Sequence, residues 1–143
     1  MMSLTSAAEP KRTLRRVLVV EDDMVLALAI EDALHAVGAT EVVICPSIAR
    51  AMQALEEAEA DCLVLDVHLA DRNDGWALAE LADQLGPRRP VIAFSTGSPE
   101  SIPPAIAEMG LVFEKPYDPA ELAQALASGP RRGFFARLRD AIG

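Results

Sequence analysis

Five short apolar runs constrain the fold more than any other feature of the sequence. They occupy residues 17–20, 42–45, 62–65, 91–94 and 111–113, and each contains at least one β-branched residue. The runs are continuous rather than alternating, which is typical of strands buried on both faces of a parallel sheet. They therefore predict five buried parallel strands.

Helical patterns separate these runs. Ser47 and Asp118 are candidate N-caps, and Gly38 is a candidate residue for the end of the first helix. Pro103 and Pro104 indicate that the helix in the fourth position is short or displaced, because each proline removes a backbone hydrogen bond. The apolar positions at helical spacing are Leu26, Ile30, Leu34 and Val37; Ile48, Ala51, Met52 and Leu55; Leu78, Leu81 and Leu85; and Leu122, Ala125 and Leu126.

Strand and helix alternate five times, which predicts the α/β class. The expected architecture is a doubly wound, five-stranded parallel sheet with helices on both faces and right-handed crossovers. With 143 residues, of which 51% are hydrophobic, the chain has the size of one domain. We assign this domain to residues 15–129, a flexible N-terminal arm to residues 1–14, and a basic amphipathic tail to residues 130–143. We expect the tail to dock as a short helix on the domain or on a partner.

The charge distribution limits the classes of partner. The net charge is −9, yet eight of the thirteen basic residues lie in the first 16 and the last 14 positions. The acidic body argues against nucleic-acid binding and favours proteins or cations as partners. No apolar run has the length needed to cross a bilayer, and Cys45 and Cys62 lie in apolar runs without metal-ligand spacing. We therefore expect a cytoplasmic protein with buried free thiols and no membrane span.

Polar residues with matching chemistry follow four of the five predicted strands. They are Glu21, Asp22 and Asp23 after the first run, Asp66 after the third, Thr96 after the fourth and Lys115 after the fifth. The carboxyl ends of parallel strands form one edge of the sheet, so these groups should converge. Clustered carboxylates repel one another unless a cation lies between them, and their oxygen ligands favour Mg²⁺.

Such a site suits phosphoryl transfer to a carboxylate. Asp66 is the candidate nucleophile, Lys115 would neutralise phosphoryl oxygens, and Thr96 would donate a hydrogen bond to one of them. Taken singly, each of these residues also has a structural interpretation as a cap, a turn residue or a solvated charge. Their combined order along the chain favours the functional interpretation.

These segments resemble the signature segments of bacterial response-regulator receiver domains. The resemblance is carried, in order and at normal spacing, by residues 17–23, 63–67, 96–97 and 114–116. It implies a flavodoxin-like sheet of strand order 2-1-3-4-5 and a cis peptide bond before Pro116. It also implies that Asp22 and Asp66 bind Mg²⁺ directly, that Glu21 acts through water, and that His68 contributes its backbone carbonyl.

The resemblance implies a stand-alone response regulator rather than a classical enzyme. Such a protein would accept a phosphoryl group on Asp66 from a histidine kinase or a histidine phosphotransfer protein, and would signal by protein contact or act as a phosphate sink. Two alternatives stay open: a pseudo-receiver that binds partners without phosphorylation, and a phosphatase of the haloacid-dehalogenase type. The latter family has its nucleophile on the first strand and a second Asp two residues later, where this chain has His68 after Asp66.

The sequence departs from the usual receiver pattern at three places. Val112 occupies the position three before the lysine that is normally aromatic, and Phe113 is predicted to be core. The loop of residues 69–75 lacks the frequent proline and is lengthened. Residues 94–98 resemble the motif of the alphaproteobacterial FATGUY subgroup, with Pro99 in place of its tyrosine. Trp76 is predicted to pack in the core or at its rim.

Overall fold

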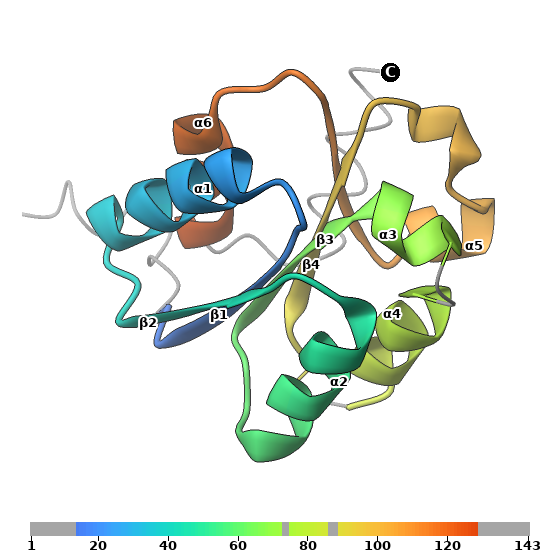
Figure 1. The fold of residues 1–143 in the computed structure, drawn as a ribbon, viewed down its shortest axis with the longest axis horizontal. Coiled ribbons are helices and arrows are strands. Elements are labelled where there is room, and N and C mark those ends of the chain that lie inside the picture. The colour runs from blue at the N-terminus through green and yellow to red at the C-terminus, as the bar shows by residue number, and fades with distance from the viewer. Residues whose placement is uncertain (1–13, 73–74, 86–88, 129–143) are drawn as a thin grey trace, which may run out of the picture.

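The computed structural model describes residues 14–72, 75–85 and 89–128. Its centre is a five-stranded sheet in which every pairing is parallel and the strand order is β2-β1-β3-β4-β5 (Figure 1). The predicted fold class and strand order are therefore confirmed. The strands are β1 (Arg16–Val20), β2 (Glu41–Cys45), β3 (Cys62–Asp66), β4 (Val91–Thr96) and β5 (Gly110–Glu114).

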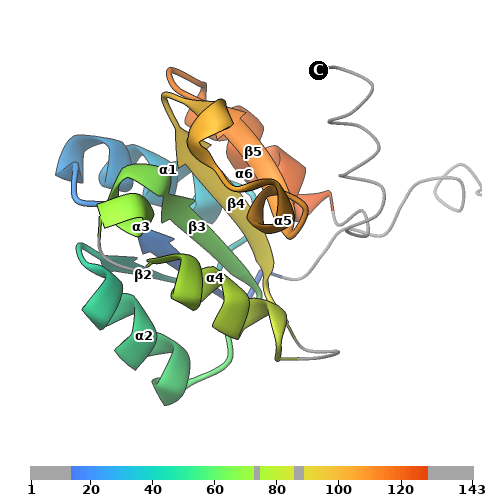
Figure 2. The ribbon, with the colours of Figure 1, turned by 90° about the vertical axis from the view of Figure 1, so that its right-hand side faces the viewer.

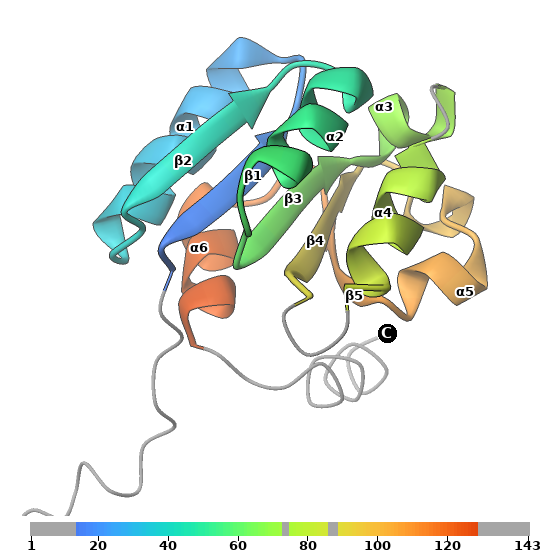
Figure 3. The same cartoon turned by 90° about the horizontal axis from the view of Figure 1, so that it is seen from below.

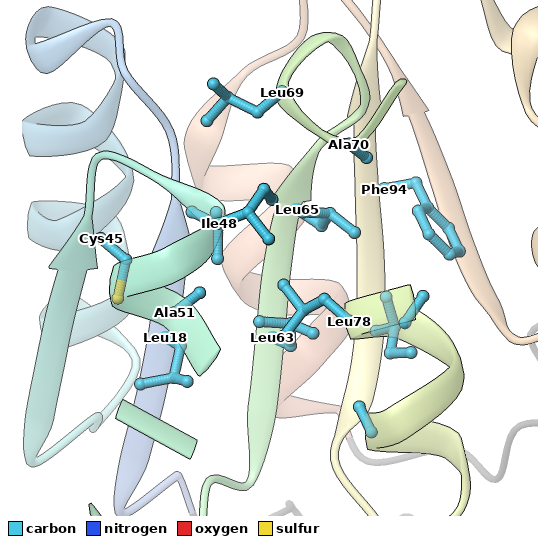
Figure 4. Packing of buried hydrophobic residues seen from close by; sticks show 14 of the residues in the cluster. Leu18, Cys45, Ile48, Ala51, Leu63, Leu65, Leu69, Ala70, Leu78 and Phe94 are labelled. Carbon is cyan, nitrogen blue, oxygen red and sulfur yellow. The ribbon is translucent and has the colours of Figure 1, made fainter. Parts of the chain in front are cut away.

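Helices cover both faces of the sheet, as Figures 1 and 2 show. One face carries α1 (Met24–Ala36) and α6 (Pro119–Ala127), which lie side by side in the view from below (Figure 3). The other face carries α2 (Ile48–Glu57), α3 (Val67–Arg72), α4 (Gly75–Asp83) and α5 (Pro104–Ala107), with a 3₁₀ turn, η3 (Pro99–Ser101), before α5. Each face has its own apolar core, and Figure 4 shows the core beneath α2 and α4.

The strands differ in burial according to their position in the sheet. All residues of β1, β3 and β4 are buried, as their continuous apolar runs predict. In contrast, β2 and β5 are only partly buried, because each lies at an edge of the sheet and has one neighbouring strand. The prediction of burial on both faces therefore holds for the three central strands.

The predicted helix ends are confirmed by their caps. Asp23 Oδ1 accepts hydrogen bonds from the N–H groups of Val25 and Leu26 at 3.0 and 3.3 Å, and Ser47 caps α2 in the same way. Asp118 accepts from the N–H of the second residue of α6, and α6 has proline in its first turn. Gly38, just after α1, has φ of +107°, a conformation in which a side chain would be strained.

Two expectations about the segment after Asp66 were wrong. The predicted loop is in part a helix, α3, whose residues Val67, Leu69 and Ala70 are buried in the core of the α2 and α4 face. Of the apolar positions expected for this helix, only Leu78 is buried: Leu81 is 39% exposed, and Leu85, which lies beyond the end of α4, is 46% exposed. The buried stripe of α4 continues instead through Ala79 and Ala82, because small side chains let the helix approach the sheet closely.

The remaining features of the fold agree with the sequence. The fourth helical position holds only η3 and α5, three and four residues long, as the prolines predict. Cys45 and Cys62 are buried and form no disulfide, and the Lys115–Pro116 peptide bond is cis. Among the described helices, none is both long and apolar enough to span a membrane. Residues 1–13 of the predicted N-terminal arm and the predicted tail, residues 130–143, lie outside the described residues.

Candidate functional site

Strand register places two of the candidate site residues, Glu21 and Asp66, in one row with Ser95 and Phe113. In each central strand, alternate side chains belong to the two opposite cores, so parity along the strand decides which face a residue meets. Asp66 is paired with Ser95 across β3 and β4, and Ser95 with Phe113 across β4 and β5. Glu21 follows Val20 by one residue, just as Asp66 follows Leu65, the register partner of Val20. The row therefore runs across four strands on the side of α1 and α6.

Three carboxylates converge at the carboxyl edge of the sheet. One oxygen from each of Glu21, Asp22 and Asp66 lies within 4.8 Å of the others. Glu21 and Asp66 are 2% and 3% exposed, whereas Asp22 is exposed. The neighbouring Asp23 caps α1 and donates its N–H to Glu21 Oε2 at 3.0 Å. Asp23 thus orients the acidic cluster without belonging to it.

Lys115 supplies the positive charge of the site. Its Nζ lies 3.5 Å from Glu21 Oε1 and 3.6 Å from Asp66 Oδ1, so one ammonium forms ion pairs with two carboxylates. Burial raises the pKa of Glu21 to about 7, and the charge of Asp66 adds to this effect. Burial alone would lower the pKa of Lys115, but the carboxylates of Asp66 and Glu21 outweigh it and hold that pKa above its ordinary value.

The carboxylates and the lysine border an open pocket of about 360 Å³. Its lining residues are Asp66, Val67, His68, Thr96, Gly97, Ser98, Ser101 and Lys115. Thr96 Oγ1 accepts the N–H of Ser98 at 2.8 Å, which orients the hydroxyl of Thr96. The N–H of His68 donates to Asp66 Oδ1 at 3.0 Å, and the side chain of His68 is exposed. The role of the His68 carbonyl as a metal ligand stays a prediction.

The acidic cluster fits a divalent cation by its chemistry. Glu21 Oε1 is a buried side-chain oxygen that has no hydrogen-bond partner among the described residues. A buried carboxylate oxygen without a hydrogen bond is costly, and the single ammonium of Lys115, 3.5 Å from Glu21 Oε1, offsets only one of the three negative charges that the cluster carries when ionised. Hard oxygen ligands of this kind, at an open edge, suit Mg²⁺.

Two residues beside the site were not predicted to matter. Ser95 lies in the ladder beside Asp66, and its Oγ lies 2.8 Å from the hydroxyl of Tyr117, two residues after Lys115. The parity of strand positions was a signal for Ser95, because it places Ser95 on the same face as Asp66. No local pattern marks Tyr117 as its partner.

A family model described as the response regulator receiver domain matches residues 17–127. The chain belongs to this family. It is therefore a receiver domain of two-component signalling, and its strand order is the one that the sequence resemblance implied.

Solved structures agree with this assignment. A response regulator from Chloroflexus aurantiacus J-10-fl is 27% identical, with a TM-score of 0.65, over 80% of this chain and 95% of that one. The receiver domain of a sensor histidine kinase from Pseudomonas aeruginosa PAO1 is 26% identical, with a TM-score of 0.65, over 82% and 100% of the two chains. That structure contains a magnesium ion coordinated in its active-site cleft.

A third structure supports the fold alone. The CheY-like receiver domain from Methylobacillus flagellatus has a TM-score of 0.68 at 24% identity, over 81% of this chain and 98% of that one. A search of curated proteins found no significant match.

Val112, at the position that is normally aromatic in receiver domains, lies on the opposite face of β5 from the aromatic residue that follows it. Val112 is partly buried and packs against the core of the α2 and α4 face. Phe113 has the opposite parity, packs against the core beneath α1 and α6, and contacts the ring of Tyr117 at a centroid distance of 5.9 Å. Trp76 packs on Phe94 at 6.3 Å, in agreement with its predicted core or rim position.

Proposed function

We propose that this receiver domain accepts a phosphoryl group on Asp66, in a reaction that depends on Mg²⁺, from a histidine kinase or a histidine phosphotransfer protein. The observation that carries this proposal is the position of Asp66: its buried carboxylate lies at the pocket, 3.6 Å from Lys115 Nζ and next to Thr96 in the pocket lining. Nucleophile, counter-charge and hydroxyl donor thus border the same open volume.

Three residues of the pocket, Asp66, Lys115 and Thr96, each have a part in the transfer. A carboxylate oxygen of Asp66 attacks the phosphorus of a phosphohistidine, the P–N bond breaks, and its electron pair returns to the imidazole nitrogen. Lys115 balances negative charge on the phosphoryl oxygens, and the hydroxyl of Thr96 donates to one of them. When bound by Asp22 and Asp66, with Glu21 acting through water, Mg²⁺ supplies further neutralisation of that charge.

The signal is read by a protein partner in this proposal. Ser98 and Ser101 line the pocket and belong to the segment that leads into α5, so a phosphoryl group on Asp66 lies beside this segment. A change there reaches the surface formed by α5 and β5, which pack together. Phosphorylation would alter the affinity of this surface for a partner, or the domain would act as a phosphate sink.

The test is covalent labelling of the purified protein with acetyl phosphate and Mg²⁺, followed by intact mass spectrometry. We expect one phosphoryl adduct on the wild-type protein and none on Asp66→Asn, because the amide keeps the shape of the carboxylate but is not a nucleophile. Asp32→Asn, which changes an exposed acid of α1, is the matched control and should be labelled normally.

Two outcomes would contradict the proposal. An adduct that persists on Asp66→Asn would assign the acceptor to another residue, and full labelling in excess chelator would refute the requirement for Mg²⁺. If the wild-type protein takes no adduct from acetyl phosphate or from a phosphorylated histidine protein, the domain acts as a binding module. Turnover of a phosphomonoester would indicate a phosphatase instead.

A further inference from the structure

Ser95 and Tyr117 form a hydroxyl pair beside the phosphoryl site. Ser95 is fully buried in β4, directly next to Asp66 in the strand ladder, and immediately precedes Thr96. Tyr117 lies in the segment between β5 and α6, two residues after Lys115. Their oxygens are 2.8 Å apart, a good distance for an O–H···O hydrogen bond.

The surroundings of Tyr117 keep this hydrogen bond in place. Its ring packs on Phe113 at an angle of 53° and against the core beneath α1 and α6. Burial raises the pKa of Tyr117, so its hydroxyl stays protonated and can donate or accept. Because Ser95 is 0% exposed, water cannot replace Tyr117 as its partner, and loss of Tyr117 would leave a buried hydroxyl without a hydrogen bond.

The pair connects the two segments that carry Thr96 and Lys115. A second link joins the same segments: the N–H of Lys115 donates to the carbonyl of Thr96 at 2.7 Å. Two hydrogen bonds therefore hold the segment of Lys115 to β4: one from the backbone N–H of Lys115 itself, and one at Tyr117, two residues later. This matters because β5 is an edge strand, held by one neighbouring strand, and its last residue is exposed.

Lys115 needs such support for the geometry of the site. Its ammonium is at similar distances from two carboxylates, 3.5 Å from Glu21 and 3.6 Å from Asp66, although its side chain is 31% exposed. A long, flexible side chain keeps one position only if its backbone is held. A small displacement of a group that must meet the transferring phosphoryl group reduces the rate strongly.

We propose that the Ser95–Tyr117 hydroxyl pair is a positioning device, which holds the segment of Lys115 against Thr96 and so sets the distance from the ammonium to Asp66. The effect on rate rests on the proposed function of Asp66 as phosphoryl acceptor. The effect on the Lys115 segment does not, so the two parts can be tested separately.

The experiment compares Tyr117→Phe, Ser95→Ala and the double variant with wild type. Ser128→Ala is the control, because the Ser128 hydroxyl donates to a carbonyl of α6 at a distance from the pocket. The first measurement is hydrogen exchange of the Lys115 amide, which needs no phosphorylation. The second is the maximal labelling rate with acetyl phosphate, together with its half-saturating concentration and the affinity for Mg²⁺ by titration calorimetry.

We expect the Lys115 amide to exchange about tenfold faster in both single variants and in the double variant, with no change in β1. The maximal labelling rate should fall about tenfold in all three, while Mg²⁺ affinity stays within about twofold, because the metal-binding carboxylates are not displaced. Equal effects in single and double variants would identify the two hydroxyls as one unit.

Unchanged exchange at Lys115 in Tyr117→Phe and Ser95→Ala would overturn the inference. So would losses of rate that multiply in the double variant, or a parallel loss of Mg²⁺ affinity, which would indicate general destabilisation of the site. If wild-type protein is not labelled on Asp66, the proposed function fails, and the exchange measurement alone still decides whether the pair holds the Lys115 segment.

Discussion

Replacing Arg16 with methionine should lower the free energy of unfolding by about 3 kcal/mol. Arg16 belongs by sequence to the basic N-terminal end of the chain, but its side chain is only 10% exposed. Its Nη1 donates to the carbonyl oxygens of Ala54 and Ala58, at 3.0 and 2.6 Å, at the end of α2. A guanidinium from β1 thus caps a helix that follows it by more than thirty residues.

The magnitude follows from these contacts. A hydrogen bond from a charged donor contributes about 1.5 to 3 kcal/mol. The lower value applies to both bonds. Ala54 O also accepts the N–H of Ala58 at 3.4 Å and keeps this partner in the variant, and Ala58 is exposed, so its carbonyl oxygen can accept from water. The ion pairs of Arg16 with Glu41 and Glu57, at 3.4 and 4.0 Å, involve half-exposed carboxylates and add little. Methionine fills the space of the apolar part of the side chain, so a cavity contributes little.

Urea unfolding followed by circular dichroism measures this loss, and a thermal scan should show a decrease of about 10 °C in Tm. The matched control is Arg50→Met, which removes an arginine of α2 that is 37% exposed and lies 3.6 Å from Glu57. It should cost less than about 0.5 kcal/mol. A loss for Arg16→Met below about 1 kcal/mol, or equal to that of the control, would refute the capping role.

Three further predictions concern the sheet and the site. Gly110→Ala should cost about 3 kcal/mol in urea unfolding, because its Cβ would meet the backbone carbonyl of Ile92 and force β5 away from β4; a cost near zero would show that β5 shifts freely. Lys115→Met should lower the rate of acetyl phosphate labelling about 100-fold while the fold is retained by circular dichroism; a normal rate would remove Lys115 from the mechanism. The pKa of Glu21 is raised from its ordinary value of 4.5 to about 7 in the folded protein. In the presence of a chelator, the contribution of Glu21 to the free energy of unfolding should therefore be fully present below pH 4.5 and be lost as the pH rises through about 7. Unfolding measured across this range should therefore show a smaller decline in Glu21→Gln, and an identical decline in both proteins would contradict the assignment.

Much of the site is predictable because it depends on strand ends. A parallel sheet brings the carboxyl ends of its strands to one edge, so residues such as Asp66, Thr96 and Lys115 converge whatever the details of packing. The caps at Asp23 and Ser47 are predictable for a related reason, since their hydrogen bonds reach only two or three residues along the chain.

The tertiary structure alone decided the contacts between segments distant in sequence. The spacing of Leu81 and Leu85 predicts that both lie on a buried helix face. In the structure the alanines of α4 are buried against the neighbouring elements instead, and both leucines are exposed. Arg16 appears from composition to be one more surface cation, and only the position of α2 makes it a buried cap. Tyr117 meets Ser95 across 22 residues because β5 pairs with β4. Periodicity and capping are local interactions that a sequence states directly, whereas the partner of a buried polar group is defined only when the elements have packed.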